Sequence, residues 1–261
     1  MLIDTKYGAL DVEQEGRGRD LVLLHSLLAD RTAFDLVRPA LSRNHRLWLV
    51  NLPGYGKSAP WDADASVEGY ADQIAEMMAV LGLPQQTDVL GNGLGGFLSV
   101  ALAIRHGGKF DRLIVADALA SFHEPGKEAL RVLAREVQEK GMAAGLDIAI
   151  LRMFPPSFIQ AHPDVVMERK QVLLQMDPAI FSRLCIALTQ LDFEPLLSRI
   201  RNRTLVTGGA LDGTTIPELV SQLAAGISGA RYVKIPESGH CPQIEQPEAF
   251  VALVEEFLST P

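Results

Sequence analysis

The stretch VLGNGLGGFLSV at positions 89–100 resembles a catalytic device that lacks its reactive group. In the G-x-S-x-G nucleophile elbow, a serine on a sharp strand-to-helix turn exposes its hydroxyl for attack on a carbonyl. Here positions 91–95 read GNGLG, so Gly93 stands where the nucleophile would be. Glycine adopts a positive φ without the strain of a side chain, but it has no atom that can attack. The pattern therefore predicts an elbow without its nucleophile.

A second interpretation of the same glycines is a phosphate-binding loop. The segment GNGLGG at 91–96 matches G-x-G-x-x-G, and Asp111 and Asp117 follow it at about the 20-residue spacing of the dinucleotide fingerprint. That fingerprint opens the first βαβ unit of a domain, whereas this turn follows the fourth or fifth predicted strand. We therefore favour the elbow, and we expect no nucleotide, flavin or metal cofactor.

Three more segments place polar residues where predicted strands end. HSL at 25–27 follows the apolar run LVLL, and NLPGYGKS at 51–58 follows the next strand. Asp212, in GGALD, and His240, in SGH, each end a late strand. The carboxyl ends of parallel strands meet at one edge of a sheet, which is where open α/β sheets bind ligands. The segments therefore predict one shared site.

The chain resembles the α/β-hydrolase superfamily over nearly its whole length, and it is most similar there to 3-oxoadipate enol-lactonases and meta-cleavage C–C hydrolases. The resemblance rests on HSLLADRTAFD, NLPGYGKS, MFPPSFIQAHPD and SGHCPQIEQPEAF, and on Asn92 before the elbow position. The chain order of nucleophile position, acid and histidine is that of the fold. The resemblance implies a mostly parallel twisted sheet with helices on both faces and an inserted helical lid. Fold does not specify substrate.

The resemblance also assigns roles. His240 is the expected general base, and Asp212 holds its other ring nitrogen. The backbone N–H groups of Leu27 and Leu94 form the expected oxyanion hole, in which each donor contributes about 2.7–4 kcal/mol to transition-state stabilisation. The catalytic set is thus Gly93 (by position), Asp212 and His240.

The remaining candidates surround this set. Ser26 stands where glycine is usual and places a hydroxyl beside the hole; we favour a turn-stabilising role over a catalytic one. His25 belongs to the same binding loop. Asp117 occupies an alternative acid position of the fold, but we favour a role in capping the entrance to the lid. Glu245 is expected to stabilise the start of the last helix.

The elements that must position these residues alternate between strand and helix, as in a mostly parallel sheet covered by helices. The alternation fails at 121–200, which predicts an all-helical lid inserted into a core of 1–120 and 201–261. Lid arginines could pair with a substrate carboxylate, although a solvated face is the commoner position: Arg152, Arg169 and Arg183. Strands are expected at 9–14, 21–25, 47–51, 87–90, 112–116, 204–207 and 231–235, and helices at 32–42, 67–81, 94–105, 217–225 and 247–258.

Composition narrows the possible partners. Hydrophobic residues make up 48% of the 261-residue chain, the net charge is −8 and the basic residues are scattered, which argues against nucleic acid or an anionic membrane as partner. Cys185 and Cys241 form no metal-binding motif. The segment at 1–16 has neither a basic nor an apolar region of the kind that opens a secretory signal. We expect a cytoplasmic monomer or homodimer acting on a small molecule.

Three hypotheses on function follow from these residues. In the first, the parent reaction is hydrolysis of a small carboxylic ester, enol-lactone or C–C bond, and this chain is a natural or engineered nucleophile-less form with little activity, which Gly93→Ser restores. In the second, Asp212 and His240 work alone as an acid–base pair in a lyase or isomerase step. In the third, the chain is a non-catalytic ligand-binding protein. We favour the first, because the remaining site segments are all present.

Overall fold

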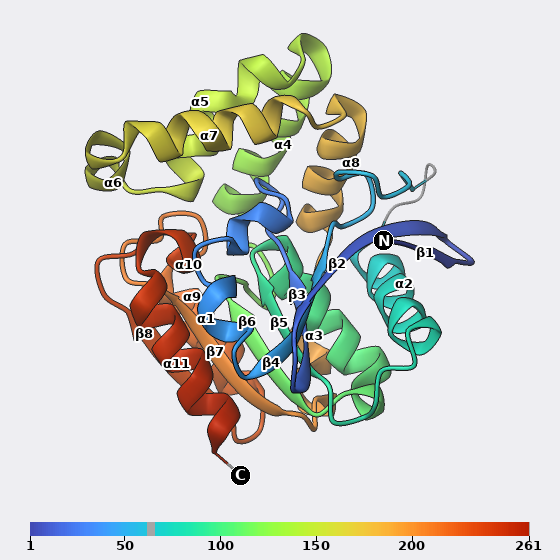
Figure 1. Ribbon diagram of the computed structural model, residues 1–261. Coiled ribbons are helices and arrows are strands. Elements are labelled where there is room, and N and C mark those ends of the chain that lie inside the picture. The colour runs from blue at the N-terminus through green and yellow to red at the C-terminus, as the bar shows by residue number, and fades with distance from the viewer. Residues whose placement is uncertain (62–65, 261) are drawn as a thin grey trace.

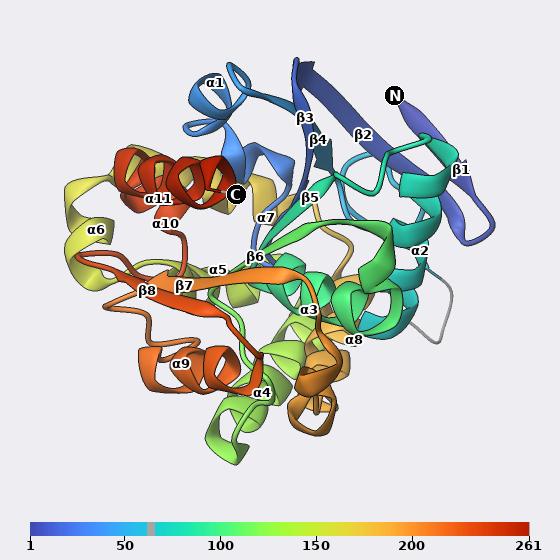
Figure 2. The ribbon, with the colours of Figure 1, turned by 90° about the horizontal axis from the view of Figure 1, so that it is seen from below.

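The computed structural model describes residues 1–61 and 66–260, whose centre is an eight-stranded sheet with helices on both faces (Figures 1 and 2). The strand order is β1-β2-β4-β3-β5-β6-β7-β8. Strand β2 pairs antiparallel with β1 and β4, and the other pairs are parallel. The strands are β1 (Leu2–Thr5), β2 (Gly8–Gly16), β3 (Arg19–Leu24), β4 (His45–Val50), β5 (Asp88–Asn92), β6 (Arg112–Ala116), β7 (Arg203–Gly209) and β8 (Arg231–Ile235).

The central strands are apolar on both faces because helices cover both. In β3, Leu21 and Leu23 belong to the apolar cluster formed with α1 (Arg38–Leu41) and α11 (Pro247–Ser259). Val22 and Leu24 belong to the cluster that contains α2 (Val67–Val80) and α3 (Leu94–His106), as period-two alternation requires. Figure 2 shows these helix pairs on opposite faces of the sheet. The helices outside the segment that joins β6 to β7 are α1 (Arg38–Leu41), α2 (Val67–Val80), α3 (Leu94–His106), α9 (Pro217–Gly226), α10 (Pro242–Glu245) and α11 (Pro247–Ser259), with 3₁₀ turns η1 (Arg31–Phe34) and η2 (Gly107–Lys109). A third 3₁₀ turn, η3 (Glu194–Arg199), ends that segment.

The mostly parallel sheet with helices on both faces and the seven predicted strands are confirmed, with local differences. Strand β1 was not predicted; it is a short edge strand that pairs only with β2, so it lacks the apolar pattern of a buried strand. The helix expected at 32–42 is wrong as a single element, because it is divided into η1 and α1. Pro39 lies in the first turn of α1 and has no N–H to continue a helix from η1.

Helices α4 to α8 connect β6 to β7 and lie together above one end of the sheet (Figure 1). An antiparallel bridge between Ser121 and Asp192 and a hydrogen bond of 2.9 Å from Phe193 N to Ala120 O join the two ends of this segment. The segment is all-helical, as expected; its status as a separate lid domain stays a prediction. Its elements are α4 (Glu124–Lys140), α5 (Met142–Met153), α6 (Pro156–Ala161), α7 (Pro163–Leu174) and α8 (Pro178–Thr189).

The order of the strands creates a topological switch point between β3 and β5. The chain passes from β3 to β4 on one side and then returns to β5 on the other, so the connections diverge between these two paired strands. A crevice at the carboxyl ends of strands is expected at such a switch point. The loop after β3 and the turn after β5 meet there, where Gly95 N donates to His25 O over 2.9 Å.

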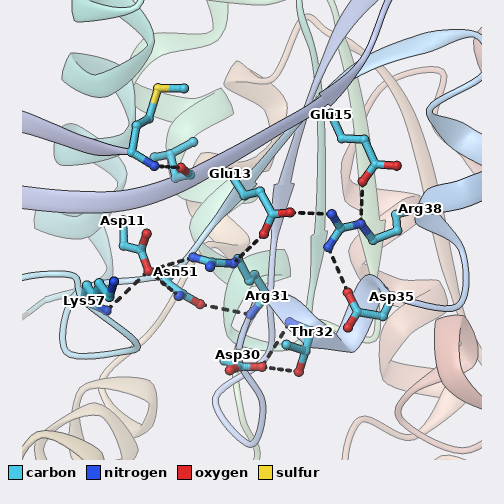
Figure 3. A network of polar contacts seen from close by, with 12 residues as sticks. Asp11, Glu13, Glu15, Asp30, Arg31, Thr32, Asp35, Arg38, Asn51 and Lys57 are labelled. Carbon is cyan, nitrogen blue, oxygen red and sulfur yellow. Dashed lines mark hydrogen bonds and ion pairs between the residues drawn. The ribbon is translucent and has the colours of Figure 1, made fainter.

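A polar network around Arg31 holds the loop that follows β3 in place (Figure 3). The buried Asp11 carboxylate on β2 accepts from Arg31 Nη1 at 2.7 Å and from Asn51 Nδ2 at 2.9 Å. Burial opposes ionisation of Asp11, but these donors outweigh it and lower its pKa. Arg31 N in turn donates to Asn51 Oδ1 over 3.1 Å. The loop is thereby tied to β2 and to the turn after β4.

Among the described residues, no single helix is both long and apolar enough to cross a bilayer. Helices α7 and α8 satisfy the length and composition of a span only as a pair, and that pair is bent by 100°.

Candidate active site

The turn between β5 and α3 has the backbone geometry of a nucleophile elbow. Gly93 has φ 54° and ψ −118°, and it links the last residue of β5 to the first of α3. Its N–H donates to Ala116 O over 3.0 Å, which holds the turn against β6. A Cβ on Gly95 would overlap the carbonyl of Leu24, so the start of α3 packs directly on β3 only because that residue is glycine. The strand–turn–helix context predicted for the motif is present.

The side chain of Ser26 lies in the space above Gly93. A Cβ built on Gly93 would overlap Ser26 Oγ, and it would lie 2.9 Å from Ser26 Cβ and 3.0 Å from His240 Nε2. Ser26 is 1% exposed, and its Oγ has no hydrogen-bond partner among the described residues. The turn is closed instead by the backbone, from Ala29 N to Ser26 O. The prediction that this hydroxyl stabilises the turn is therefore wrong.

His240 and Asp212 meet at the end of β7 and β8. His240 Nδ1 donates to Asp212 Oδ2 over 2.8 Å, which leaves the Nε2 lone pair facing Gly93. The other carboxylate oxygen accepts from Thr214 N at 2.7 Å and Thr215 N at 3.1 Å. Burial favours the neutral acid, but His240 and these donors hold the pKa of Asp212 below its usual value. A paired, ionised carboxylate that orients an imidazole is the arrangement that a general base requires.

Glu245 positions the histidine loop from behind. Its carboxylate accepts from Gly239 N at 2.8 Å and from Cys241 N at 3.0 Å, on either side of His240. Burial raises its pKa to about 7, although both hydrogen bonds favour ionisation. A further hydrogen bond ties this loop to the helical segment: His240 N donates to Met153 O at the end of α5 over 3.0 Å. The expectation that Glu245 serves mainly to start the last helix is wrong, since its carboxylate is used by this loop.

A second buried group of polar side chains lies beneath the elbow. Asp117 Oδ1 accepts from Gly209 N at 2.9 Å, and Oδ2 accepts from Asn92 Nδ2 at 3.0 Å. Asn92 also accepts from Gln243 Nε2 at 3.0 Å. Burial and the nearby Asp212 carboxylate raise the pKa of Asp117 well above its usual value. The predicted capping role is wrong, because His123 is the N-cap residue of α4.

Leu27 and Leu94, whose backbone N–H groups are the expected oxyanion donors, both line the cavity described below. In the described part of the chain, neither Leu27 N nor Leu94 N donates to a backbone or side-chain acceptor, and Leu94 is the first residue of α3, whose N–H has no partner within the helix.

The side chain of His25 supports the loop after β3 rather than lining the cavity. Its ring is fully buried, donates from Nδ1 to Ser26 O at 2.8 Å and accepts from Leu52 N at 2.9 Å. Desolvation lowers the pKa of His25 to about 4. It therefore supports the loop as a neutral imidazole.

One small cavity beneath α4, α5 and α8 is lined by most of the predicted site residues. The space that the centre of a water molecule can reach there is about 20 Å³. Of the predicted residues, Asp212 lies behind His240 and His25 lies outside the lining. The cavity is lined by Ser26, Leu27, Leu28, Gly93, Leu94, Phe97, Phe122, Leu130, Arg152, Leu188, Thr214, Thr215 and His240.

The three arginines of the helical segment α4–α8 have separate environments. Arg152, from α5, lines the cavity and makes no ion pair with any described carboxylate within 4.0 Å. Desolvation lowers its pKa. Arg169 is buried against Thr32 Oγ1 at 3.0 Å and Glu168, whereas Arg183 lines a different groove, between α4 and α8. The sequence offers no signal that separates them, because only the packing of the helices decides which one faces the site.

Asp117, Asp212 and His240 could in principle supply metal ligands. One ligand atom of each lies within 4.8 Å of the others. However, the Nδ1 atom of His240 already donates to Asp212, and the raised pKa of Asp117 favours its neutral form, which is a poor cation ligand. The arrangement suits proton transfer better than metal binding.

Comparison with known proteins agrees with this geometry. A family model described as "Alpha/beta hydrolase family" matches residues 21–253, and the chain belongs to that family.

Similar proteins include esterases and lactonases. The chain is 29% identical over 202 residues to 3-oxoadipate enol-lactonase 2 of Acinetobacter baylyi, covering 77% of this chain and 74% of that protein. It is 28% identical over 260 residues to a pimeloyl-[acyl-carrier protein] methyl ester esterase of Aeromonas hydrophila, covering 96% and 99%. The crystal structure of the enol-lactonase from Burkholderia xenovorans LB400 superposes with a TM-score of 0.94 at 25% identity, covering all of both chains.

Proposed function

We propose that this protein hydrolyses the carboxylic ester or enol-lactone of a small molecule. One observation carries the proposal: His240 Nε2, oriented by Asp212, lies 3.0 Å from the point where a side chain on Gly93 would begin. Leu27 and Leu94, whose N–H groups are the proposed oxyanion donors, line the same cavity. Relatives named for an enol-lactone and for a methyl ester support an acyl carbonyl as the reacting group.

Each of these parts serves attack on a carbonyl. The base takes the proton from the attacking oxygen, which contributes about 10²–10⁴-fold to the rate. The two N–H groups then stabilise the oxyanion, at about 2.7–4 kcal/mol for each donor. The sequence alone predicts little activity, because position 93 supplies no hydroxyl. We propose instead that activity persists, which is supported by the pairing of His240 with Asp212 and by Leu27 and Leu94 in the cavity lining.

Arg152 supports an anionic substrate. Among the described residues that line this mostly apolar cavity, Arg152 and His240 are the basic side chains. His240 is paired with Asp212, whereas Arg152 has no carboxylate partner there. A desolvated guanidinium without a counterion favours a substrate that brings one, and a carboxylate matches its two-pronged geometry. We therefore propose a carboxylate-bearing ester or lactone.

The substrate proposal is tested with a matched pair of esters. We expect Arg152→Gln to raise KM for 4-nitrophenyl hemisuccinate about tenfold or more, because a charge-assisted hydrogen bond contributes about 1.5–3 kcal/mol. KM for neutral 4-nitrophenyl butyrate should change little. Arg183→Gln, which alters the other groove, is the control. Equal effects of Arg152→Gln on both esters would contradict carboxylate recognition.

The reaction class is tested separately with a panel of 4-nitrophenyl esters and small lactones. We expect hydrolysis by the unmodified protein and its loss in His240→Asn. Products of isomerisation or elimination that require His240, without hydrolysis, would instead identify an acid–base enzyme. Ligand-induced thermal stabilisation without any product would identify a binding protein. Either result would overturn the proposed hydrolysis.

A further inference from the structure

We propose that the nucleophile of this site is the hydroxyl of Ser26, displaced from the elbow to the neighbouring loop. This inference rests on the proposed hydrolysis and adds a covalent acyl-Ser26 intermediate. Two independent observations carry it: the burial of an unpartnered hydroxyl, and its position relative to the base and the oxyanion donors.

The Ser26 hydroxyl carries an unmet hydrogen-bonding capacity. The residue is 1% exposed, and Oγ has no partner in the part of the chain that the structure describes. A buried polar group left in this way destabilises the folded state, and most such groups in proteins are paired. By contrast, the equally buried Ser99 on α3 donates to Gly96 O over 2.8 Å. The cost at Ser26 is of the kind that functional sites retain.

The position of the hydroxyl is that of the absent elbow side chain. The point where a Cβ on Gly93 would lie is within 3.0 Å of Ser26 Oγ and of His240 Nε2. The hydroxyl and the base are therefore at most about twice that distance apart. Catalytic hydrogen bonds often shorten only when substrate is bound, and rotation about the Ser26 Cα–Cβ bond can bring Oγ toward Nε2.

Glycine at position 93 follows from the same geometry. Any side chain there would compete with Ser26 for one volume, because its Cβ would overlap Oγ and lie 2.9 Å from Ser26 Cβ. Gly93 and Ser26 are thus complementary in size: Gly93 has no side chain, and the Ser26 side chain fills the volume that one would occupy. The proposed oxyanion donors adjoin both members of this pair, since Leu27 N directly follows Ser26 and Leu94 N directly follows Gly93. A nucleophile at either position would therefore use the same two donors.

The proposed step is balanced. Ser26 Oγ forms a bond to the carbonyl carbon while its proton passes to His240 Nε2. The C–O bond to the leaving alcohol then breaks, and that alkoxide takes the proton from His240, which leaves an acyl-Ser26 ester. In the second half, water attacks the ester, its proton passes through His240 to the Ser26 oxygen, and the carboxylic acid is released. No oxidant, reductant or metal enters either half.

The experiment combines kinetics with covalent labelling. The protein, Ser26→Ala and the control Ser99→Ala are assayed with 4-nitrophenyl butyrate, and each is treated with a fluorophosphonate. Attack on that probe forms an O–P bond and expels fluoride, so the adduct is mapped by peptide mass spectrometry. We expect labelling of Ser26 in the unmodified protein and in Ser99→Ala. In Ser26→Ala we expect no label and a loss of kcat on the order of 10³-fold or more, with an unchanged or higher melting temperature.

The outcomes separate this inference from the proposed function. Unchanged hydrolysis in Ser26→Ala, without a label on Ser26, would refute the relocated nucleophile and leave a water activated by His240. Labelling of Ser26 without hydrolysis of any acyl substrate would support the nucleophile and refute the proposed function. Neither labelling nor hydrolysis in the unmodified protein would refute both.

Discussion

Restoring a serine at the elbow tests whether Gly93 and Ser26 compete for one space. In the present backbone, Gly93→Ser introduces a non-glycine residue at φ 54°, which costs about 1–3 kcal/mol. The new Cβ also overlaps Ser26 Oγ and lies 2.9 Å from Ser26 Cβ, and overpacking of this kind costs about another 1–3 kcal/mol. We expect the single variant to lose about 2–6 kcal/mol of unfolding free energy.

Ser26→Gly removes the two Ser26 atoms that the new Cβ would meet and leaves His240 Nε2 at 3.0 Å from it. The double variant Ser26→Gly/Gly93→Ser should therefore keep the backbone strain but lose the overlap. The two substitutions are then expected to be non-additive, with a coupling of about 1–3 kcal/mol in the double variant's favour. The double variant also moves the hydroxyl to the elbow, next to His240 Nε2. We expect it to hydrolyse 4-nitrophenyl esters faster than Gly93→Ser alone.

The assay is urea unfolding followed by tryptophan fluorescence on all four members of the cycle, together with initial rates. Ser99→Ala/Gly93→Ser is the control pair, since Ser99 Oγ is bonded within α3 and the pair should be additive. Additivity of the Ser26 and Gly93 changes to within about 0.5 kcal/mol would show that they do not share a volume. That result would refute the steric reasoning, whatever the activity.

Three other changes test separate parts of the site. Asp212→Asn should lower kcat about 10²–10⁴-fold, since an amide cannot hold His240 as the carboxylate does; an unchanged rate would contradict the pairing. Asn92→Ala removes donors to Asp117 and to the His240 loop and should cost about 1–3 kcal/mol by calorimetry. The folded-state pKa of Glu245, about 7, exceeds its ordinary 4.5, so its protonated form stabilises the fold below pH 4.5 and this contribution is lost as the pH rises through 7. Relative to Glu245→Gln, the unmodified protein should thus lose up to about 3 kcal/mol between pH 4.5 and 8 in urea titrations; a flat difference would contradict this.

Much of the fold follows from local patterns. Continuous apolar runs such as LVLL predict buried parallel strands, and turn residues mark their ends, so seven strands and the elbow could be located without coordinates. Strand β1 was not predicted, because an edge strand that pairs on one side needs no apolar run. The helix at 32–42 failed because Pro39 interrupts a pattern that is otherwise helical.

The roles of individual polar residues were harder to predict. Asp117, Glu245 and His25 all stand at positions where side-chain direction depends on neighbouring strands and loops, which are remote in sequence. Each of them supports the site from outside the cavity. Asp117 accepts hydrogen bonds from Asn92 and Gly209, Glu245 accepts from the His240 loop, and His25 donates to the backbone of the β3 loop.

The sequence by itself predicted the family, the residues proposed as base and acid, and the absence of a hydroxyl at position 93, because each prediction depends only on residue type and chain order. Tertiary structure decided what fills the resulting space. The loop after β3 meets the turn after β5 only once these strands pair, and that contact puts Ser26 Oγ where an elbow side chain would be. It likewise decided that Arg152, rather than Arg169 or Arg183, faces the cavity, because helix packing sets the direction of each side chain.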